Sequence, residues 1–261
     1  VNSAGWAAGT AGALLAHRLS ADPRHRVLQV EAGPDLPPGH EPADIRSIFP
    51  LSTFNPRCMW PDTRVHWRDA TRSPAAPMPQ GRILGGSSNI MGMWAMRGKP
   101  SVYDAWAKAG ATGWDWAGVL PYFRRLETDH NIEGPLHGTD GPVPIRCEPP
   151  EAWLPLATAF HAAARQHGFA DGHCVRPISR FENQRGSARL CYLDAPTRTR
   201  SNLVVRTRCR VLRLRFDDDS GSPRIIGAEL LHDDGRRETV DARRAVVTAG
   251  ALRTSQLLMR P

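Results

Sequence analysis

The sequence predicts an α/β chain: a three-layer, Rossmann-like nucleotide-binding domain with an antiparallel meander. Two observations lead to this fold class. A glycine turn followed by a helix pattern occurs near both ends of the chain, around residues 10 and 250, as in the strand–turn–helix units of a parallel sheet. Residues 203–240 instead show short strand patterns separated by tight turns, which is typical of an antiparallel meander.

The first glycine turn carries a dinucleotide-binding pattern. Residues 7–12 (Ala-Ala-Gly-Thr-Ala-Gly) occupy the frame Gly-x-Gly-x-x-Gly, and a helix pattern follows at residues 13–19. Residues 25–30 then predict a strand that ends at Glu31, 19 residues after Gly12. An acid at that distance is suited to bind a ribose hydroxyl, so this segment predicts a nucleotide site.

The same segment departs from the pattern in two ways. Ala7 replaces the first glycine, and residues 1–6 lack the continuous apolar run that is typical of a buried parallel strand. We therefore expect the first strand to be absent and the turn to hold a nucleotide less tightly.

Residues 34–79 contain ten prolines and little hydrophobic periodicity. This composition predicts an extended lid or loop that wraps over the body of the domain.

Residues 80–98 (Gln-Gly-Arg-Ile-Leu-Gly-Gly-Ser-Ser-Asn-Ile-Met-Gly-Met-Trp-Ala-Met-Arg-Gly) are the most informative stretch. The two adjacent glycines allow a backbone to pass close to a ligand, and the two serines after them indicate a helix start. Residues 90–96 are almost wholly apolar, which predicts a buried helix. A helix that begins in this way is suited to hold a phosphate at its N-terminus.

The remaining segments predict further elements. Residues 137–142 predict a turn into a strand at residues 143–146, and residues 151–167 predict an amphipathic helix. Residues 245–259 predict a strand, a glycine turn and a helix. The histidines of the chain show no metal-ligand spacing, so we expect no metal site.

Residues 80–98 resemble the first signature of the glucose–methanol–choline (GMC) family of flavin-dependent alcohol oxidoreductases, and residues 245–259 resemble the opening of its second signature. The matching positions are Gly81, Arg82, Leu84, Gly85, Gly86, Ser87, Ser88, Ile90, Gly92 and Gly98 in the first, and Gly250, Ala251, Thr254, Ser255, Leu257 and Leu258 in the second. The resemblance implies FAD as the cofactor and a small-molecule alcohol as the substrate. It also implies hydride transfer from the carbinol carbon to flavin N5.

Carried over onto this sequence, the resemblance implies FAD contacts from the N-terminal turn, both signatures and the meander. The cofactor-binding residues that it implies are Gly9, Thr10, Ala11, Gly12, Glu31, Ala32, Arg82, Gly85, Gly86, Ser87, Ser88, Asn89, Gly92, Met93, Val211, Ala249 and Gly250. Met91 stands where the family usually carries Asn or His near the flavin, and we expect its side chain to pack within the buried helix.

The resemblance also divides the chain. It implies a first part of an FAD-binding domain at residues 1–130, a partial substrate-binding domain at residues 131–195, and a truncated second part of the FAD-binding domain at residues 196–261. Only about the first half of a typical family member is covered, and the catalytic histidine of the family lies outside that half. We therefore assign no catalytic residue and expect the isolated chain to be inactive as an enzyme. The alcohol and the electron acceptor, oxygen or a separate acceptor, are left open.

Three alternatives stay open at this point. A non-catalytic, truncated remnant would not retain FAD. An arginine-rich polyanion-binding domain would bind nucleic acid with an affinity that falls steeply with salt. A Rossmann dehydrogenase that uses NAD would account for Glu31 but not for residues 81–98.

The amino-acid composition argues against the nucleic-acid-binding alternative. The formal net charge is +8, and only Lys99 and Lys108 among the basic residues are lysines. The arginines are scattered rather than gathered into a stripe, which favours a GC-rich genome as their cause over nucleic-acid binding. The five cysteines form no Cys-x-x-Cys, no apolar run is long enough to cross a bilayer, and no secretory leader is visible at Val1. These features predict reduced thiols, no membrane span and a cytoplasmic protein.

Overall fold

The structure is a computed structural model that describes residues 3–6, 8–169, 177–217 and 223–259. The chain divides into two compact units, which we call the sheet unit (residues 1–91 and 187–261) and the insert unit (residues 92–186). The predicted boundaries at residues 130 and 195 do not coincide with these units. Helix α4 (Trp116–Leu126) runs directly into strand β5 (Glu127–Asp129), whose partner strands belong to the insert unit, so a boundary at 130 would split a sheet.

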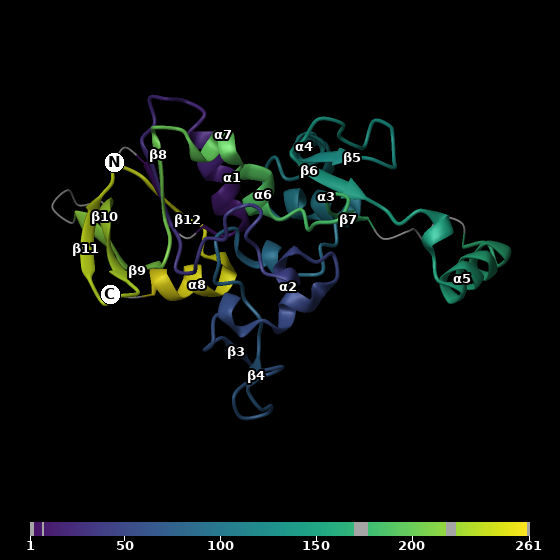
Figure 1. The fold of residues 1–261 in the computed structure, drawn as a ribbon, viewed down its shortest axis with the longest axis horizontal. Coiled ribbons are helices and arrows are strands. Elements are labelled where there is room, and N and C mark those ends of the chain that lie inside the picture. Colours follow the sequence, from purple (N-terminus) through teal and green to yellow (C-terminus); the bar gives the residue numbers. More distant parts are fainter. Residues whose placement is uncertain (1–2, 7, 170–176, 218–222, 260–261) are drawn as a thin grey trace. The chain divides into compact units, whose positions relative to one another are not determined.

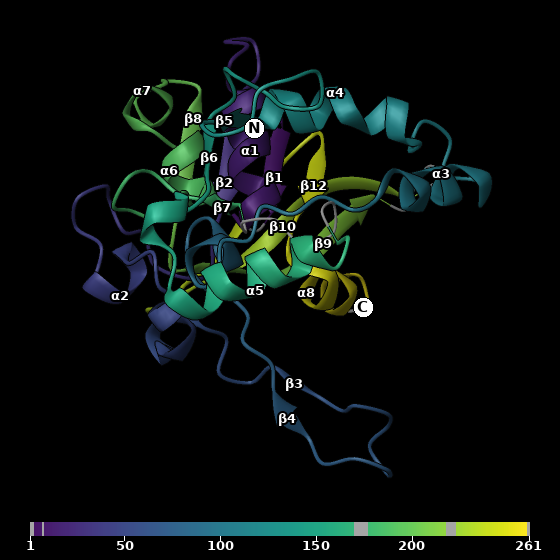
Figure 2. The same cartoon turned by 90° about the vertical axis from the view of Figure 1, so that its right-hand side faces the viewer.

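A four-stranded parallel sheet forms the centre of the sheet unit (Figure 1). Its strands, in spatial order, are β12 (Ala245–Val247), β1 (Ser3–Trp6), β2 (Val27–Val30) and β8 (Leu203–Arg206). Helix α1 (Thr10–Leu19) links β1 to β2 and packs against them through small buried residues, Ala13 and Ala16 (Figure 2). This arrangement confirms the predicted Rossmann-like α/β fold.

Strand β1 corrects one prediction. We expected residues 1–6 to form no strand, but Ser3–Trp6 is an inner strand that pairs with β2 on one side and β12 on the other. Backbone N–H and C=O groups that are paired on both sides hold a strand whatever its side chains, whereas an apolar run reports side chains alone. Ala7, the other expected weakness, lies outside the described residues.

The meander is a three-stranded antiparallel sheet of β9 (Cys209–Asp217), β10 (Arg224–His232) and β11 (Arg237–Asp241). The predicted strand at residues 203–207 is not part of it, because Leu203–Arg206 instead extends the parallel sheet beside β2. Leu28 and Val30 of β2 share one buried core with Ala228 and Leu230 of β10. The meander therefore covers one face of the parallel sheet, and α1 packs on the other face. Helix, sheet and meander are the predicted three layers.

The predicted lid, residues 34–79, holds short elements rather than a bare loop. They are helix α2 (Ala43–Arg46), the 3-10 turns η1 (Pro50–Phe54) and η2 (Pro56–Cys58), and a hairpin of β3 (Arg64–Val65) with β4 (Ala76–Pro77). Two ion pairs tie its start to the short helices α6 (Ala188–Tyr192) and α7 (Ala195–Arg198): Arg189 with Glu41 at 2.9 Å, and Arg198 with Asp35 at 2.6 Å.

The prediction of a buried helix at residues 90–96 is wrong. The segment follows a 3-10 turn, η3 (Gly86–Asn89), and is not helical. Its side chains Met91, Trp94 and Met96 are 48%, 57% and 63% exposed. Residues 93–95 are not helical because they pair with residues 177–179: the Ser179 amide donates to the Met93 carbonyl and the Ala95 amide donates to the Pro177 carbonyl. These distant backbone bonds replace the helical ones, and Met91 is half exposed instead of packed.

The insert unit contains a mixed three-stranded sheet in the order β5, β6 (Val143–Arg146) and β7 (Ile178–Ser179). Its helices are α3 (Pro100–Lys108), α4, the 3-10 turn η4 (Pro150–Ala152) and α5 (Pro155–Gln166). The predicted turn into the strand at 143–146 is confirmed. Helix α5 also forms as predicted, but Leu156 and Phe160 of its apolar face are exposed.

Two further predictions concern cysteines and membranes. Cys58, Cys147, Cys191 and Cys209 carry free thiols, and Cys174 lies outside the described residues. Across those parts of the chain that the structure describes, none of the helices has the length and apolar character needed to span a bilayer. A cytoplasmic location stays a prediction.

Candidate nucleotide-binding site

A cleft of about 560 Å³, which includes space open to solvent, lies in the sheet unit beyond the end of β2. Three residues predicted to bind the cofactor belong to segments far apart in sequence but lie close together here: Ala32 after β2, Val211 on β9, and Ala249 before helix α8 (Gly250–Leu258) line it. The remaining lining residues are Val30, Trp60, Cys209, Arg210, Arg253, Gln256 and Leu257. A mostly apolar cleft at the carboxyl end of a parallel strand is where α/β sheets bind nucleotides.

Glu31 follows directly after β2, beside this cleft, and is only 5% exposed. Its Oε1 accepts a hydrogen bond of 2.8 Å from the Gly33 amide, and no basic side chain of the described residues forms an ion pair with it. Burial raises the pKa of Glu31 to about 7, although the amides of Gly33 and Ala8 and the charge of Arg82 act in the opposite direction. A buried carboxyl without a cation is available for hydroxyl groups of a ligand.

The N-terminus of α1 meets the glycine pair of residues 85 and 86. Gly9 is the N-cap of α1 and supplies no side-chain cap, so the first-turn amides are not covered by a side chain. A Cβ on Gly86 would lie 2.8 Å from the Gly9 Cα, and the Gly85 amide donates to the Ala8 carbonyl at 2.6 Å. The two glycine segments, 75 residues apart, are therefore packed backbone to backbone, and Thr10 Oγ1 also donates to Gly85.

The polar side chains that follow the glycine pair hold the shape of this loop. Ser87 Oγ accepts from the Gly81 amide, and Ser88 Oγ donates to Gly85 and accepts from Ala188. The buried Asn89 donates to the carbonyls of Leu84 and Gly86. These groups fix the loop from within, so any ligand contact from it comes mainly from its backbone.

Arg82 lies on the other side of the loop and faces the meander and the lid. Its guanidinium pairs with Asp233 at 3.1 Å and stands 5.5 Å from the centre of the Trp60 ring. Arg253 of α8 stands over the same ring at 4.3 Å and pairs with Asp62 at 2.5 Å. Trp60 is thus held by two arginines.

Sequence reasoning did not find Trp60, Arg253 or Gln256. Arg253 and Gln256 follow Ala249 at helical spacing, as does Leu257. The helix predicted after the second glycine turn could therefore have indicated that these side chains lie on the same face as Ala249. Trp60 has no such signal, because it lies in the irregular lid.

The other predicted site residues are placed as follows. Ala11 and Gly12 lie in the first turn of α1, and Gly250 begins α8 with a positive φ of 75°. Gly92 and Met93 belong to the insert unit. Met93 is buried and has a positive φ of 61°, which is uncommon for a residue with a side chain.

Comparison with known proteins identifies the family. The profile described as GMC oxidoreductase matches residues 8–261. The chain belongs to the GMC oxidoreductase family. The family resemblance inferred from residues 80–98 and 245–259 is thereby confirmed, as is FAD as the cofactor of this family.

Curated relatives support the same conclusion. A 5-(hydroxymethyl)furfural oxidase of Methylovorus sp. (strain MP688) is 38% identical over 97% of this chain and 50% of its own length. The mitochondrial choline dehydrogenase of Mus musculus is 32% identical over 97% of this chain and 44% of its own length. This GMC chain therefore spans about half the length of the curated relatives that it matches.

Solved structures confirm the fold. Pyridoxine 4-oxidase from Mesorbium loti superposes with a TM-score of 0.86 at 31% identity, covering 99% of this chain and 51% of that protein. An FAD-dependent oxidoreductase from Chaetomium thermophilum reaches a TM-score of 0.84 at 26% identity, covering 98% of this chain and 46% of that protein.

Proposed function

We propose that this chain forms the FAD-binding part of an oxidoreductase that acts on the CH–OH group of a small-molecule alcohol. The observation that carries the proposal is the cleft lined by Ala32, Val211 and Ala249, with the buried Glu31, which forms no ion pair among the described residues, next to Ala32 in the chain. Distant segments supply these residues, and each was implied by the family resemblance on independent grounds.

The residues fit FAD in three places. The apolar cleft suits an adenine ring, and Glu31 suits the adjoining ribose, since a carboxylate accepts hydrogen bonds from hydroxyls. Gly9 and Thr10 begin helix α1, whose uncovered amides suit a pyrophosphate. The loop of Gly85 and Gly86, packed on Gly9, would complete this cradle. When bound, FAD supplies a hydride acceptor.

The substrate class rests on the relatives. The 5-(hydroxymethyl)furfural oxidase and the choline dehydrogenases act on molecules that carry a primary alcohol. We infer a primary alcohol as substrate of the protein to which this chain corresponds. The relatives include oxidases and dehydrogenases, so the proposal specifies the alcohol oxidation and not the electron acceptor.

Flavin retention tests the proposal. The purified chain is incubated with FAD, freed of unbound cofactor and examined for visible absorbance. We expect a retained flavin spectrum, and its loss in Glu31→Ala because the ribose contact is removed. Glu133→Gln, which changes an exposed acid of the insert unit, is the matched control.

A folded chain that stays colourless, judged by circular dichroism, would contradict the proposal and support the non-catalytic remnant. With flavin retained, anaerobic mixing with 5-(hydroxymethyl)furfural, choline or pyridoxine separates cofactor binding from catalysis. Bleaching by an alcohol would mean that the chain alone oxidises it.

A further inference from the structure

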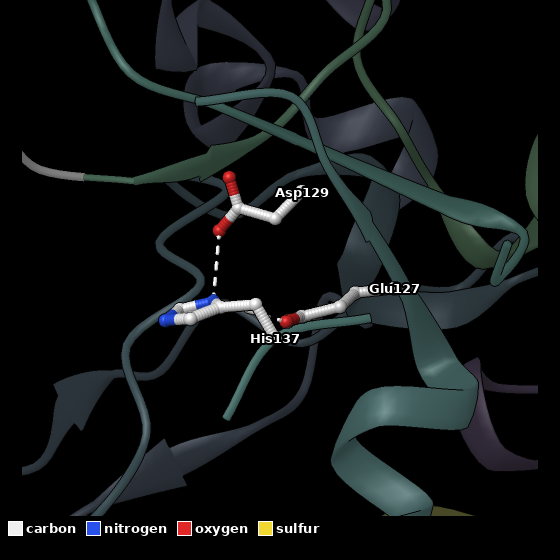
Figure 3. A group of neighbouring side chains, drawn as sticks. All are labelled: Glu127, Asp129 and His137. Atoms are coloured by element: carbon white, nitrogen blue, oxygen red, sulfur yellow. Dashed lines mark ion pairs between the residues drawn. The ribbon is translucent and has the colours of Figure 1, made fainter. Parts of the chain in front are cut away.

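Three metal-ligating side chains of the insert unit gather at one place (Figure 3). Glu127 and Asp129 stand two residues apart on β5 and therefore share one face of the strand. His137 comes from the loop that returns beside this strand. Ligand atoms of the three residues all lie within 4.8 Å of one another.

The two carboxylates are buried and need compensating positive charge. The side chains of Glu127 and Asp129 are 7% and 2% exposed. Arg97 provides one positive charge through its contact with Glu127 Oε1. A bound cation would provide the second, because two buried anions with one cation are costly.

The imidazole geometry favours a cation. His137 Nδ1 lies 3.0 Å from Asp129 Oδ2 and 3.3 Å from Glu127 Oε1. This nitrogen is buried, yet neither oxygen, nor any other acceptor of the described residues, is oriented to form a hydrogen bond with it. Ligand atoms around a tetrahedral zinc ion with bonds of about 2.0–2.2 Å are separated by roughly 3.3–3.5 Å. The 3.3 Å separation matches such an edge, and the 3.0 Å separation is shorter than one. What favours a cation is the buried Nδ1, which has no hydrogen-bond partner among the described residues.

We propose that Glu127, Asp129 and His137 bind a divalent transition-metal ion of the zinc class. One imidazole nitrogen and two carboxylate oxygens are a ligand set that zinc accepts, with a water molecule as the usual fourth ligand. None of the three residues is among those proposed to bind FAD, so this proposal does not rest on the proposed oxidoreductase function.

The backbone around the cluster is fixed in a way that suits a binding site. Asp129 Oδ1 accepts from the amides of Asn131 and Ile132, which leaves Oδ2 directed toward His137. The Asp129 amide donates to the Gly138 carbonyl, and the Gly138 amide donates to Glu127 Oε1. Because these hydrogen bonds already hold the side chains in place, the side chains lose little conformational freedom when an ion binds. Arg97 and Gly138 both donate to Glu127 Oε1, and each carboxylate oxygen has about two acceptor sites, so Oε2 is the oxygen of Glu127 that is left for a metal.

Metal titration tests this site. The full chain is stripped with a chelator, dialysed, and titrated with Zn²⁺ by calorimetry and with Co²⁺ by visible absorption. We expect one tight zinc ion per chain, and binding at least tenfold weaker in His137→Gln and in Asp129→Asn. His130→Gln, which alters an exposed histidine next to Asp129 in sequence, should bind zinc like the wild type.

Two results would overturn the proposal. One is wild-type zinc binding no tighter than that of folded Asp129→Asn, which would assign the signal to surface histidines. The other is a ¹⁵N NMR spectrum in which His137 remains a doubly protonated imidazolium at saturating Zn²⁺, since the proton rather than a metal would then balance the carboxylates.

Discussion

Two buried glutamates of the sheet unit, Glu31 and Glu41, have opposite surroundings. Glu41 in the lid pairs with Arg189 at 2.9 Å, and the side chains of both residues are 1% exposed. Glu31, at the end of β2, is buried without any ion pair among the described residues. Desolvation acts on both carboxyls, but Arg189 lowers the pKa of Glu41 overall, whereas burial raises the pKa of Glu31 to about 7.

This difference separates an anchor from a binding group. A buried acid with its cation in place holds two segments together, and its charge is already compensated. A buried acid without a cation costs stability in the empty protein, and that cost is recovered only when a ligand supplies hydrogen bonds. The four predictions below test this distinction.

The largest effect is expected from Arg189→Ala. Removing one partner of a buried ion pair typically costs about 3–5 kcal/mol of unfolding free energy, because the other charge, here that of Glu41, loses its compensation by Arg189. Arg189 also donates to the Leu36 carbonyl, so the start of the lid should loosen. Urea unfolding measures the loss of stability, and limited proteolysis should reveal cleavage within residues 34–46.

Arg165→Ala, on the exposed helix α5, is the control and should unfold like the wild type. The double variant Arg189→Ala with Glu41→Ala should regain part of the lost stability, because no charge is then left unpaired. Equal stability of Arg189→Ala and the wild type would show that the lid is not anchored here.

Glu31→Gln should have the opposite effect on the empty chain. Because the pKa of Glu31 rises from 4.5 to about 7 on folding, the native state binds more protons than the unfolded state between these pH values. Stability from this group therefore falls as pH rises from 4.5 to 7, by about 3 kcal/mol at most. Glu31→Gln should remove this decline and be more stable than the wild type at pH 8.

Flavin binding completes this test. Ionised Glu31 accepts hydrogen bonds from both ribose hydroxyls, so FAD affinity should increase as pH rises through 7 in the wild type and not in Glu31→Gln. Fluorescence titration of FAD at pH 6 and pH 8 measures both proteins. Identical pH profiles would mean that Glu31 does not contact the cofactor.

The same contrast shows which parts of the molecule could be predicted from sequence. Glu31 follows from a local pattern of glycine turn, helix and strand, whereas Val211 and Ala249 are implied by the family resemblance. Strand β1 and the pairing of residues 93–95 with residues 177–179 could not be predicted, because backbone pairing with distant segments decides them. Glu127, Asp129 and His137 carry no familiar ligand spacing, since a loop rather than one element brings them together.

A smaller effect is expected from Arg253→Gln. Its guanidinium stacks on Trp60 at 4.3 Å and both residues line the proposed adenine cleft. Such a contact contributes about 1 kcal/mol, so losing it should weaken FAD binding roughly fivefold. Arg243→Gln, at an exposed position just before β12, is the charge-matched control. If both variants bind FAD equally well, the contact between Arg253 and Trp60 does not contribute to FAD binding.

The smallest effect, Gln29→Met, tests how far the distinction extends. Gln29 lies two residues before Glu31 on β2, is 1% exposed, and neither atom of its amide has a hydrogen-bond partner among the described residues. It adjoins α1, beside a small cavity lined by Leu15 and Ala16, and it does not line the nucleotide cleft. We therefore expect no hydrogen bond between this unpaired amide and FAD.

Gln29→Met should raise the free energy of unfolding by about 1 kcal/mol and leave FAD affinity unchanged, with Gln166→Met on exposed α5 as control. A loss of stability would instead indicate an ordered water on the amide, and weaker FAD binding would mean that the whole carboxyl end of β2 responds to the cofactor.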